Sequence, residues 1–543
     1  MAPEVKRESA ASTGWQRDRA WVAAGMILLA GHVISFGFFE IDDAYISFRY
    51  ARNLLDGHGL VFNPGDPVEG YSNLLWVLLS AAGMAGGLPP LIWARILGLG
   101  SALLIIAFTP AMIRRLHPRA GWVAGAGALL MACCGPLACW SFSGLETVFF
   151  AALAVWAWFA VLGGRSLEVG IASLLLALTR PDGLALGAAF VLWSWLPSRG
   201  VGPGVGGAAR EIKGDVATGT GTGQAGWQRW AGPLLFGSGV LAHFLWRHAT
   251  YGEWLPNTYF AKTGDLMGQL RTGLPYGVDF LRTYLVPWFV VGLWASWVSQ
   301  AQTLRSTALV RTLMLCGLWF LYAVIIGGDM LGMFRFFVPI LPLLIAAGTA
   351  LLSLALGQNA LTSQRRAAGI VVLILALISL LPSTVGKERR LISAHMSLMN
   401  LGGWKLAGDT LAAHFPAGTT IALGPAGYIP FRTGFKAFDL LGVTDRHIAH
   451  KQMPFTQGYA GHEKHDGPYI LSQRPDYLLL GNVDVTSQPR QSLIPPFSRE
   501  VDILTHPVFQ RDYEQVVIPL DAGRYLNCFK RRDVPLPIGE RSH

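Results

Sequence analysis

The chain has 543 residues, of which 52% are hydrophobic and only 14% are charged. Soluble domains carry roughly 25% charged residues, so this composition excludes an ordinary soluble protein and predicts an integral membrane protein with a soluble part. The net charge of +10 does not indicate nucleic-acid binding, because many Lys and Arg residues lie in short loops between apolar runs, as the positive-inside rule describes.

Eleven apolar runs are candidate transmembrane helices. The first follows a polar tail, residues 1–20, whose basic residues place it in the cytoplasm. This run is too long for the apolar core of a cleaved signal peptide, so we expect a retained helix. The predicted fold class is a polytopic α-helical membrane protein of about 11 transmembrane helices. The runs are 21–39, 91–113, 121–139, 145–162, 167–179, 183–196, 231–248, 284–299, 312–326, 336–356 and 368–385.

A further apolar run, Leu74–Gly87, is ambiguous, and the distribution of basic residues decides its interpretation. If this run does not cross the membrane, every basic loop after it lies on the same side as the N-terminus. We therefore expect a juxtamembrane or re-entrant helix. The loop 40–90 and everything after residue 386 then lie on the opposite, extracytoplasmic side.

Two changes in composition divide the chain into parts. Residues 197–229 are largely Gly-rich without apolar periodicity, which predicts a flexible cytoplasmic linker within a transmembrane domain of residues 21–385. In residues 386–543 the apolar runs shorten, and Pro, Gly, His and charged residues increase. One amphipathic helix and several strands predict a small soluble α/β domain there. The helix is 405–415, and the strands are 419–424, 475–482 and 515–520.

The loop after the first apolar run has the densest set of polar residues. Glu40, Asp42 and Asp43 stand where the helix leaves the bilayer, a position at which carboxylates are costly unless they are paired or used. Cations and further acids follow within the same loop. The adjacent acids could simply mark the helix end, or they could work together in proton transfer.

This loop also carries a resemblance to a known family. The run DDAYISFRYARNLLDGHGLVFNPGDPVEGYSN (42–73) resembles the first extracytoplasmic loop of bacterial GT-C glycosyltransferases, which take sugar from a polyprenyl-phosphate donor. The pattern is most similar to that of the actinobacterial terminal arabinofuranosyltransferases. Weaker support comes from TRPDG (179–183), WLPNTYFAK (254–262) and GGDMLGMFR (327–335).

The resemblance implies an inverting glycosyltransferase in the plasma membrane, with its catalytic face and C-terminal domain outside the cytoplasm. The donor would be a polyprenyl-phosphate-linked sugar, with arabinofuranose favoured, and the acceptor a hydroxyl of a cell-envelope glycan or glycolipid. Two alternatives remain, namely a transporter or flippase for a lipid-linked sugar and a non-catalytic protein that binds envelope polymer. The chain shows no evident half-repeat and its acids gather at one face, which counts against a transporter.

The resemblance further implies that the catalytic base is an acid of this loop, and we favour Asp42 with Asp43 in support. The remaining predicted site residues would bind substrate. They are Arg49, Arg52, His58, Glu69, Tyr71, Asn73, Arg180, Asn257, Lys262, Asp329 and Arg335.

Several of these cations have a second interpretation. Arg49 and Arg52 could bind phosphate or pair with nearby acids of the loop. Lys262 and Arg335 stand at the outer ends of apolar runs, where they could hold phosphate or extend toward lipid headgroups. Arg180 is expected first to form a salt bridge with Asp182, with substrate contact second.

We expect no metal site and no cofactor. The five cysteines form no CxxC motif, and the spacing of the histidines at 447, 450, 462 and 465 is not that of a metal site. A polyprenyl-phosphate donor has one phosphate, and the adjacent Asp42 and Asp43 are not spaced as DxD. Arg and Lys side chains could hold a leaving monophosphate, so the sequence predicts a metal-independent reaction.

Overall fold

The computed structural model describes residues 5–537, apart from 38, 197–227, 263–265, most of 286–305, 357–361, 402, 454–462 and 493–496. The predicted linker, 197–229, lies almost wholly outside the described residues, and the predicted span 284–299 lies mostly outside them.

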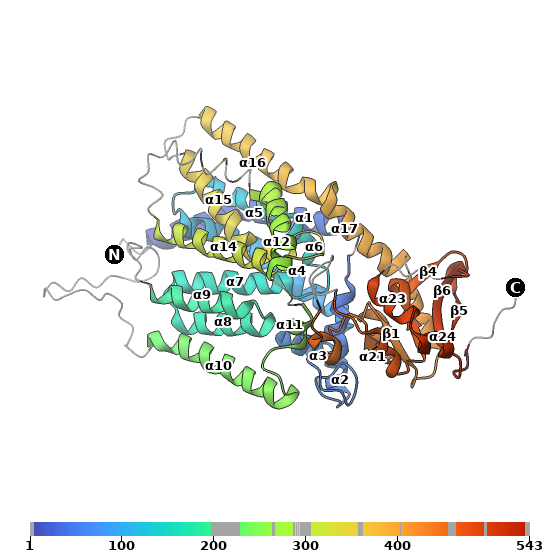
Figure 1. The fold of residues 1–543 in the computed structure, drawn as a ribbon. Helices are drawn as coiled ribbons and strands as arrows, with labels where there is room; N and C mark the ends of the chain where they lie inside the picture. Colours follow the sequence, from blue (N-terminus) through green and yellow to red (C-terminus); the bar gives the residue numbers. More distant parts are fainter. Residues whose placement is uncertain are drawn as a thin grey trace.

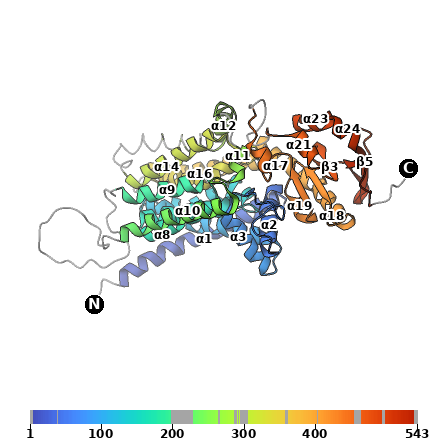
Figure 2. The ribbon, with the colours of Figure 1, turned by 60° about the horizontal axis from the view of Figure 1, so that its bottom comes forward.

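A bundle of apolar helices makes up most of the molecule, and a smaller sheet-containing domain covers one end of it (Figure 1). The start of α1 lies at the opposite end of the bundle, and a second view gives the same arrangement (Figure 2). The helices of the bundle and its outer loops are α1 (Val5–Ser35), α2 (Asp42–Leu55), α3 (Leu74–Ala85), α4 (Pro90–Leu116), α5 (Trp122–Ala132), α6 (Gly135–Trp140), α7 (Thr147–Leu162), α8 (Ser166–Thr179), α9 (Gly183–Trp195), α10 (Gln228–Tyr251), α11 (Asn257–Lys262), α12 (Leu266–Phe280), η1 (Leu281–Leu285), α14 (Thr307–Ile325), η3 (Arg335–Ile340), α15 (Leu341–Leu356) and α16 (Thr362–Thr384).

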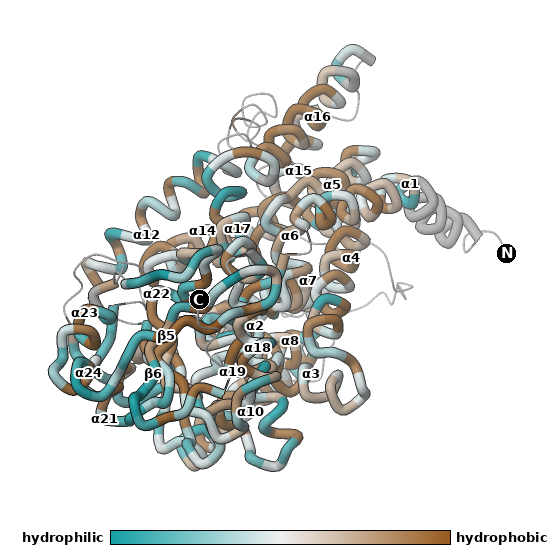
Figure 3. The backbone as a smooth tube through the Cα atoms, turned by 90° about the vertical axis from the view of Figure 1, so that its right-hand side faces the viewer, coloured by the Kyte–Doolittle hydropathy of each residue, from teal (hydrophilic) through white to brown (hydrophobic). Residues whose placement is uncertain are grey.

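Three of the described helical segments are long and apolar enough to cross a membrane, namely 90–116, 307–325 and 335–355. A bent pair, 367–382 with 387–414, makes up to four if it is counted as one span. Five shorter apolar helices, α3, α5, α7, α8 and α9, accompany them. Hydropathy separates the two parts of the molecule, with apolar helices in the bundle and polar segments around β5, β6 and α24 (Figure 3).

Two details of the bundle bear on the predictions. The helix α1 begins at Val5, so it includes most of the predicted polar tail, residues 1–20. The short helices α8 and α9 pack against each other and flank Arg180–Asp182, as the sequence predicts. The helix α3 has 12 residues. It is therefore about 18 Å long and shorter than a bilayer core.

The C-terminal domain contains a six-stranded mixed sheet with the order β2-β1-β3-β6-β4, and β5 pairs with β6. Strands β1, β2 and β3 are parallel, and the others are antiparallel. Its elements are α17 (Lys387–Met396), η4 (Ser397–Leu401), α18 (Trp404–His414), β1 (Thr420–Leu423), α19 (Tyr428–Thr433), β2 (Lys436–Asp439), α20 (Arg446–His450), α21 (Gly467–Ser472), β3 (Tyr477–Leu479), α22 (Leu480–Val483), β4 (Asp484–Thr486), α23 (Ser498–Leu504), α24 (Pro507–Asp512), β5 (Tyr513–Leu520), η5 (Asp521–Gly523) and β6 (Arg524–Arg531).

The two faces of this sheet contribute to different hydrophobic cores. Side chains alternate along a strand, so Ile421 and Leu423 of β1 join a core that runs on into the helix bundle. Ala422, between them, joins a separate core under the other face with Leu478 and Ile470. Because one core is shared with the bundle and α19 contacts α2, the C-terminal domain is packed onto the bundle and onto α2 rather than tethered beside them.

Candidate active site

Asp42 is the first residue of α2, and its carboxylate is buried against the C-terminal domain. Its side chain is 5% exposed. One carboxylate oxygen accepts the backbone N–H of Gly427 and the other that of Tyr428, both at 2.8 Å. Burial raises the pKa of Asp42 to about 7 even though these two hydrogen bonds oppose the shift. A carboxylate engaged in this way has little access to an acceptor hydroxyl, so the geometry argues against Asp42 as the base.

Asp43, the next residue, is exposed. Its charge acts on Lys262, Arg335 and His395. Within the described part of the chain, its carboxylate makes no hydrogen bond or ion pair. Asp43 therefore offers an accessible carboxylate among cations, as a base in this loop requires.

Lys262 ends α11 and approaches the same group of charges. Its side chain is exposed, yet the surrounding protein excludes enough water to lower its pKa, an effect that the charges of Asp43 and Asp329 oppose. Among the described residues its ammonium has no hydrogen bond or ion-pair partner. An unpaired ammonium held by protein can bind an anionic group that arrives with a substrate.

Arg335 and Asp329 form an ion pair at the start of η3, with 2.5 Å between Nε and Oδ2. The loop that carries them is held in a rare conformation, because Met333 and Phe334 have φ angles of 61° and 45°. The N–H of Met333 is bound by the carboxylate of Glu388, and its carbonyl accepts Nε1 of Trp140. The loop therefore presents a fixed cation and acid toward Asp43.

A chain of buried polar groups lies beside this pair. Arg180 donates to Asp182 through Nε and Nη2, and its Nη1 donates to Glu146. Glu146 also accepts Nδ2 of Asn73, which is hydrogen-bonded in turn to Ser47. The predicted salt bridge between Arg180 and Asp182 is confirmed, and Asn73 acts as a link between the loop and Glu146.

Arg49 and Arg52 point toward the C-terminal domain and not toward these charges. Arg49 is 3% exposed and donates to the carbonyls of Phe62, Pro430 and Phe435, and to Oδ1 of Asn63. Arg52 donates to the carbonyl of Phe431. Their donors are directed at main-chain carbonyls, so the structure supports neither the expected phosphate contact nor the expected pairing with the loop acids.

Most of the other residues predicted to bind substrate are already ion-paired or hydrogen-bonded within the protein. Glu69 is buried in a two-point ion pair with Arg247 of α10. The hydroxyl of Tyr71 lies 3.0 Å from that of Tyr251. Asn257 donates to the carbonyls of 442, 443 and 445. His58 is exposed in the turn after α2 and belongs to neither group of contacts.

Comparisons with known proteins identify the fold. Residues 394–534 match a family model described as a domain of unknown function, DUF8728. Over 256 residues the chain is 32% identical to a terminal β-(1→2)-arabinofuranosyltransferase of Mycobacterium tuberculosis. That match covers 45% of this chain and only 38% of the length of the relative.

Two crystal structures of ArnT from Cupriavidus metallidurans also resemble this structure. The undecaprenyl phosphate complex has a TM-score of 0.50 at 13% identity and covers 77% of this chain and 85% of ArnT. The apo structure has a TM-score of 0.52 at 14% identity and covers 79% and 86%. This chain has the GT-C fold. The predicted α-helical membrane fold with a small C-terminal α/β domain is confirmed, and the chain is a multi-pass membrane protein. The count of about 11 transmembrane helices stays a prediction.

Three contributors to this candidate site were missed from the sequence. Glu146 could have been found, because it is the one acid between Glu69 and Glu168 and stands among apolar residues. His395 of α17 accepts the N–H of Asp42 at 3.4 Å, and Gly427 approaches the same residue. Neither of these two carries a sequence signal, because each acts through a contact with a distant part of the chain.

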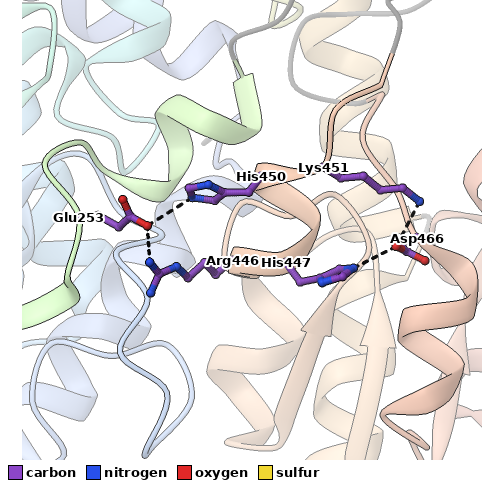
Figure 4. Close-up of a pocket in the computed structure, with 6 residues that line it drawn as sticks. All are labelled: Glu253, Arg446, His447, His450, Lys451 and Asp466. Atoms are coloured by element: carbon purple, nitrogen blue, oxygen red, sulfur yellow. Dashed lines mark hydrogen bonds and ion pairs between the residues drawn. The ribbon is translucent and has the colours of Figure 1, made fainter.

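A second group of charged residues lines an open hollow of about 510 Å³ where the membrane domain meets α20. Glu253 faces Arg446 and His450, while Asp466 faces His447 and Lys451 (Figure 4). The acids are thus matched by cations, and none of the predicted catalytic residues lines the hollow. Among the described residues, no three His, Cys, Asp or Glu side chains come together as metal ligands would.

Proposed function

We propose that this chain is an inverting glycosyltransferase that transfers a sugar from a polyprenyl-phosphate donor to a hydroxyl of a cell-envelope glycan or glycolipid. The reaction takes place on the extracytoplasmic face of the plasma membrane, where Asp43, Lys262 and the C-terminal domain lie. Arabinofuranose is the favoured sugar, because the loop pattern and the curated relative both point to it.

The observation that carries this proposal is that two opposite charges influence each other while no hydrogen bond or ion pair among the described residues engages either of them. Asp43 and Lys262 act on each other electrostatically, both are accessible, and within the described residues neither has a hydrogen-bond partner. A group-transfer reaction from a phosphate donor needs these two elements, a base for the acceptor and a cation for the leaving group.

In the proposed step, Asp43 removes the proton of the acceptor hydroxyl as its oxygen attacks the anomeric carbon. The bond between that carbon and the phosphate oxygen breaks on the opposite side of the sugar, and its electron pair goes to the phosphate. A single displacement of this kind inverts the anomeric configuration. Asp43 ends the step as the carboxylic acid and then loses its proton to water.

The departing polyprenyl phosphate gains negative charge as the bond breaks. Lys262 supplies the unpaired cation, and Arg335 adds its charge while Asp329 fixes its direction. Both oxygens of Asp329 are engaged, Oδ2 with Arg335 and Oδ1 with the amide of Leu331, so its part is to hold Arg335 and not to bind a sugar hydroxyl. The polyprenyl phosphate donor is supported by the undecaprenyl phosphate bound to ArnT, which shares this fold.

The experiment is transfer by the purified chain with a panel of polyprenyl-phosphate sugars and a mixture of envelope glycans and glycolipids. We expect sugar transfer from at least one donor, one polyprenyl phosphate released per sugar, and an inverted anomeric linkage. Movement of intact donor across a vesicle membrane without any transfer would instead identify a flippase. Binding of glycan without transfer or movement would identify a non-catalytic protein.

A further inference from the structure

We propose that the C-terminal domain positions the reactive carboxylate of Asp43 by holding Asp42 through the backbone amides of Gly427 and Tyr428. The proposal rests on the proposed function and deepens it, because it gives the domain of unknown function a part in the transfer reaction. Gly427 and Tyr428 are positioning residues in this account, since they act on Asp43 through its neighbour.

Hydrogen bonds hold Asp42 both at its side-chain carboxylate and at its backbone amide. Its two carboxylate oxygens accept the amides of Gly427 and Tyr428 at 2.8 Å each, and its own amide donates to Nε2 of His395. All of these partners lie after residue 386. Asp42 and Asp43 form the first turn of α2, so fixing the backbone of Asp42 also fixes the direction of the Asp43 side chain.

The close approach at this point depends on glycine. A Cβ atom at position 427 would lie 1.9 Å from the carbonyl oxygen of Asp42 and 2.6 Å from its carboxyl carbon. Real atoms do not approach so closely, and the obstructing atoms include backbone, so either α2 or the 427 loop must move. Gly427 is therefore required for space and not for an unusual φ angle, which is −94° here.

The rest of α2 rests on the same domain. The guanidinium groups of Arg49 and Arg52 donate to the carbonyls of Pro430, Phe431 and Phe435. These residues follow closely after the two whose amides hold Asp42. The ring of Tyr45 lies edge-on to that of Tyr428, with 4.9 Å between ring centroids. With several anchors along one helix, α2 has little freedom to rotate about its axis, and Asp43 keeps one direction toward Lys262 and Arg335.

The test compares Gly427→Ala with Gly418→Ala, a matched control in an exposed turn where a Cβ meets no atom within 4 Å. We expect Gly427→Ala to lower kcat about 100-fold, the cost of a misplacement of roughly 1 Å, with a smaller change in donor KM. Gly418→Ala should be within twofold of the wild type. When Gly427→Ala is added to Asp43→Asn, we expect little further loss, because both changes remove the same correctly placed carboxylate.

A second measurement keeps the inference testable if Gly427→Ala does not fold. In Asp42→Asn one oxygen remains to accept an amide, while the new NH₂ group faces the other donor. We expect hydrogen exchange at the amides of Gly427 and Tyr428 to become at least tenfold faster in Asp42→Asn, and to stay unchanged in Asp43→Asn.

The outcomes separate the inference from the proposed function. If the wild type transfers sugar and Asp43→Asn does not, while Gly427→Ala folds and keeps full kcat, the positioning role is wrong and the proposed function stands. Unchanged exchange at 427 and 428 in Asp42→Asn would overturn the contact itself. A wild type that transfers no sugar from any donor overturns both.

Discussion

The two sides of α2 differ in whether their charged groups have partners. Toward the C-terminal domain, Asp42 and Arg49 are buried and bonded to main-chain groups. On the other side, Asp43 is exposed, as is the neighbouring Lys262 of α11, and among the described residues neither has a hydrogen-bond partner. Buried charges are stable only when they are hydrogen-bonded or paired, whereas accessible charges are solvated by water and can bind a substrate. Charge density is high throughout the loop, whereas the pattern of bonding separates the polar groups that hold the fold from those left accessible to a substrate.

The largest expected effect outside the base itself is at Lys262. Lys262→Met removes the unpaired cation near the leaving phosphate, and we expect kcat to fall about 100- to 1,000-fold. Lys436→Met, at an exposed position on β2, is the matched control and should leave kcat within twofold. Equal rates for the two variants, measured at equal amounts of folded protein, would remove Lys262 from the reaction.

Arg49 tests the buried side of α2, where we expect substitutions to lower stability. Arg49→Lys cannot reach all of the carbonyls that the guanidinium holds, so buried acceptors lose their donor. We expect the free energy of unfolding to fall by about 3 kcal/mol and the melting temperature in detergent to fall with it. Arg119→Lys, at an exposed position, should melt as the wild type does.

A different result would restore the original interpretation of Arg49. If Arg49→Lys melts normally while the donor KM rises, the guanidinium binds phosphate, and the two sides of α2 do not differ as described.

The sequence predicted the fold correctly for physical reasons, and the same kind of reasoning singled out the loop. Apolar runs of membrane length predict the bundle, and acids at the end of such a run are costly enough to signal a function. Strand alternation and an amphipathic helix predicted the small sheet domain, although β2, β4 and β6 were missed. These signals are local, so they can be read from neighbouring residues.

The sequence could not predict which polar residues of the loop are hydrogen-bonded within the protein and which remain accessible. Asp42 and Asp43 are neighbours of the same type, and what separates them is a hydrogen bond to residues 427 and 428. Likewise, the pairing of Glu69 with Arg247 and of Arg49 with the carbonyl of Phe435 joins segments far apart in the chain. Only the folded chain shows which polar groups are already used.

A smaller effect is expected from pH. The folded-state pKa of Asp42 is about 7, against an ordinary value of 3.8, because the carboxylate is buried. The folded chain therefore binds more protons between these values than the unfolded chain does, and its stability falls as pH rises from about 4 to about 7. We expect the melting temperature of the wild type, relative to Asp42→Asn, to decline across this window. A rise across the same window would contradict the burial of Asp42.

The smallest expected effect is that of chelation. A monophosphate leaving group needs less positive charge than a diphosphate, and Lys262 with Arg335 supplies it. Transfer in excess EDTA should match the untreated rate. Loss of activity that Mg²⁺, Mn²⁺ or Ca²⁺ restores would make the loop acids ligands and require a different base.

The most direct measurement is the transfer rate of Asp43→Asn beside that of Asp42→Asn, each at equal folded protein and with a donor that the wild type uses. The substitution at 43 changes one accessible group, so we expect kcat to fall about 100- to 10,000-fold with an unchanged melting temperature. The substitution at 42 should cost less activity and should also lower the melting temperature at acidic pH. Near-normal transfer by Asp43→Asn, together with a complete loss in a normally folded Asp42→Asn, would contradict the account and return the base to Asp42.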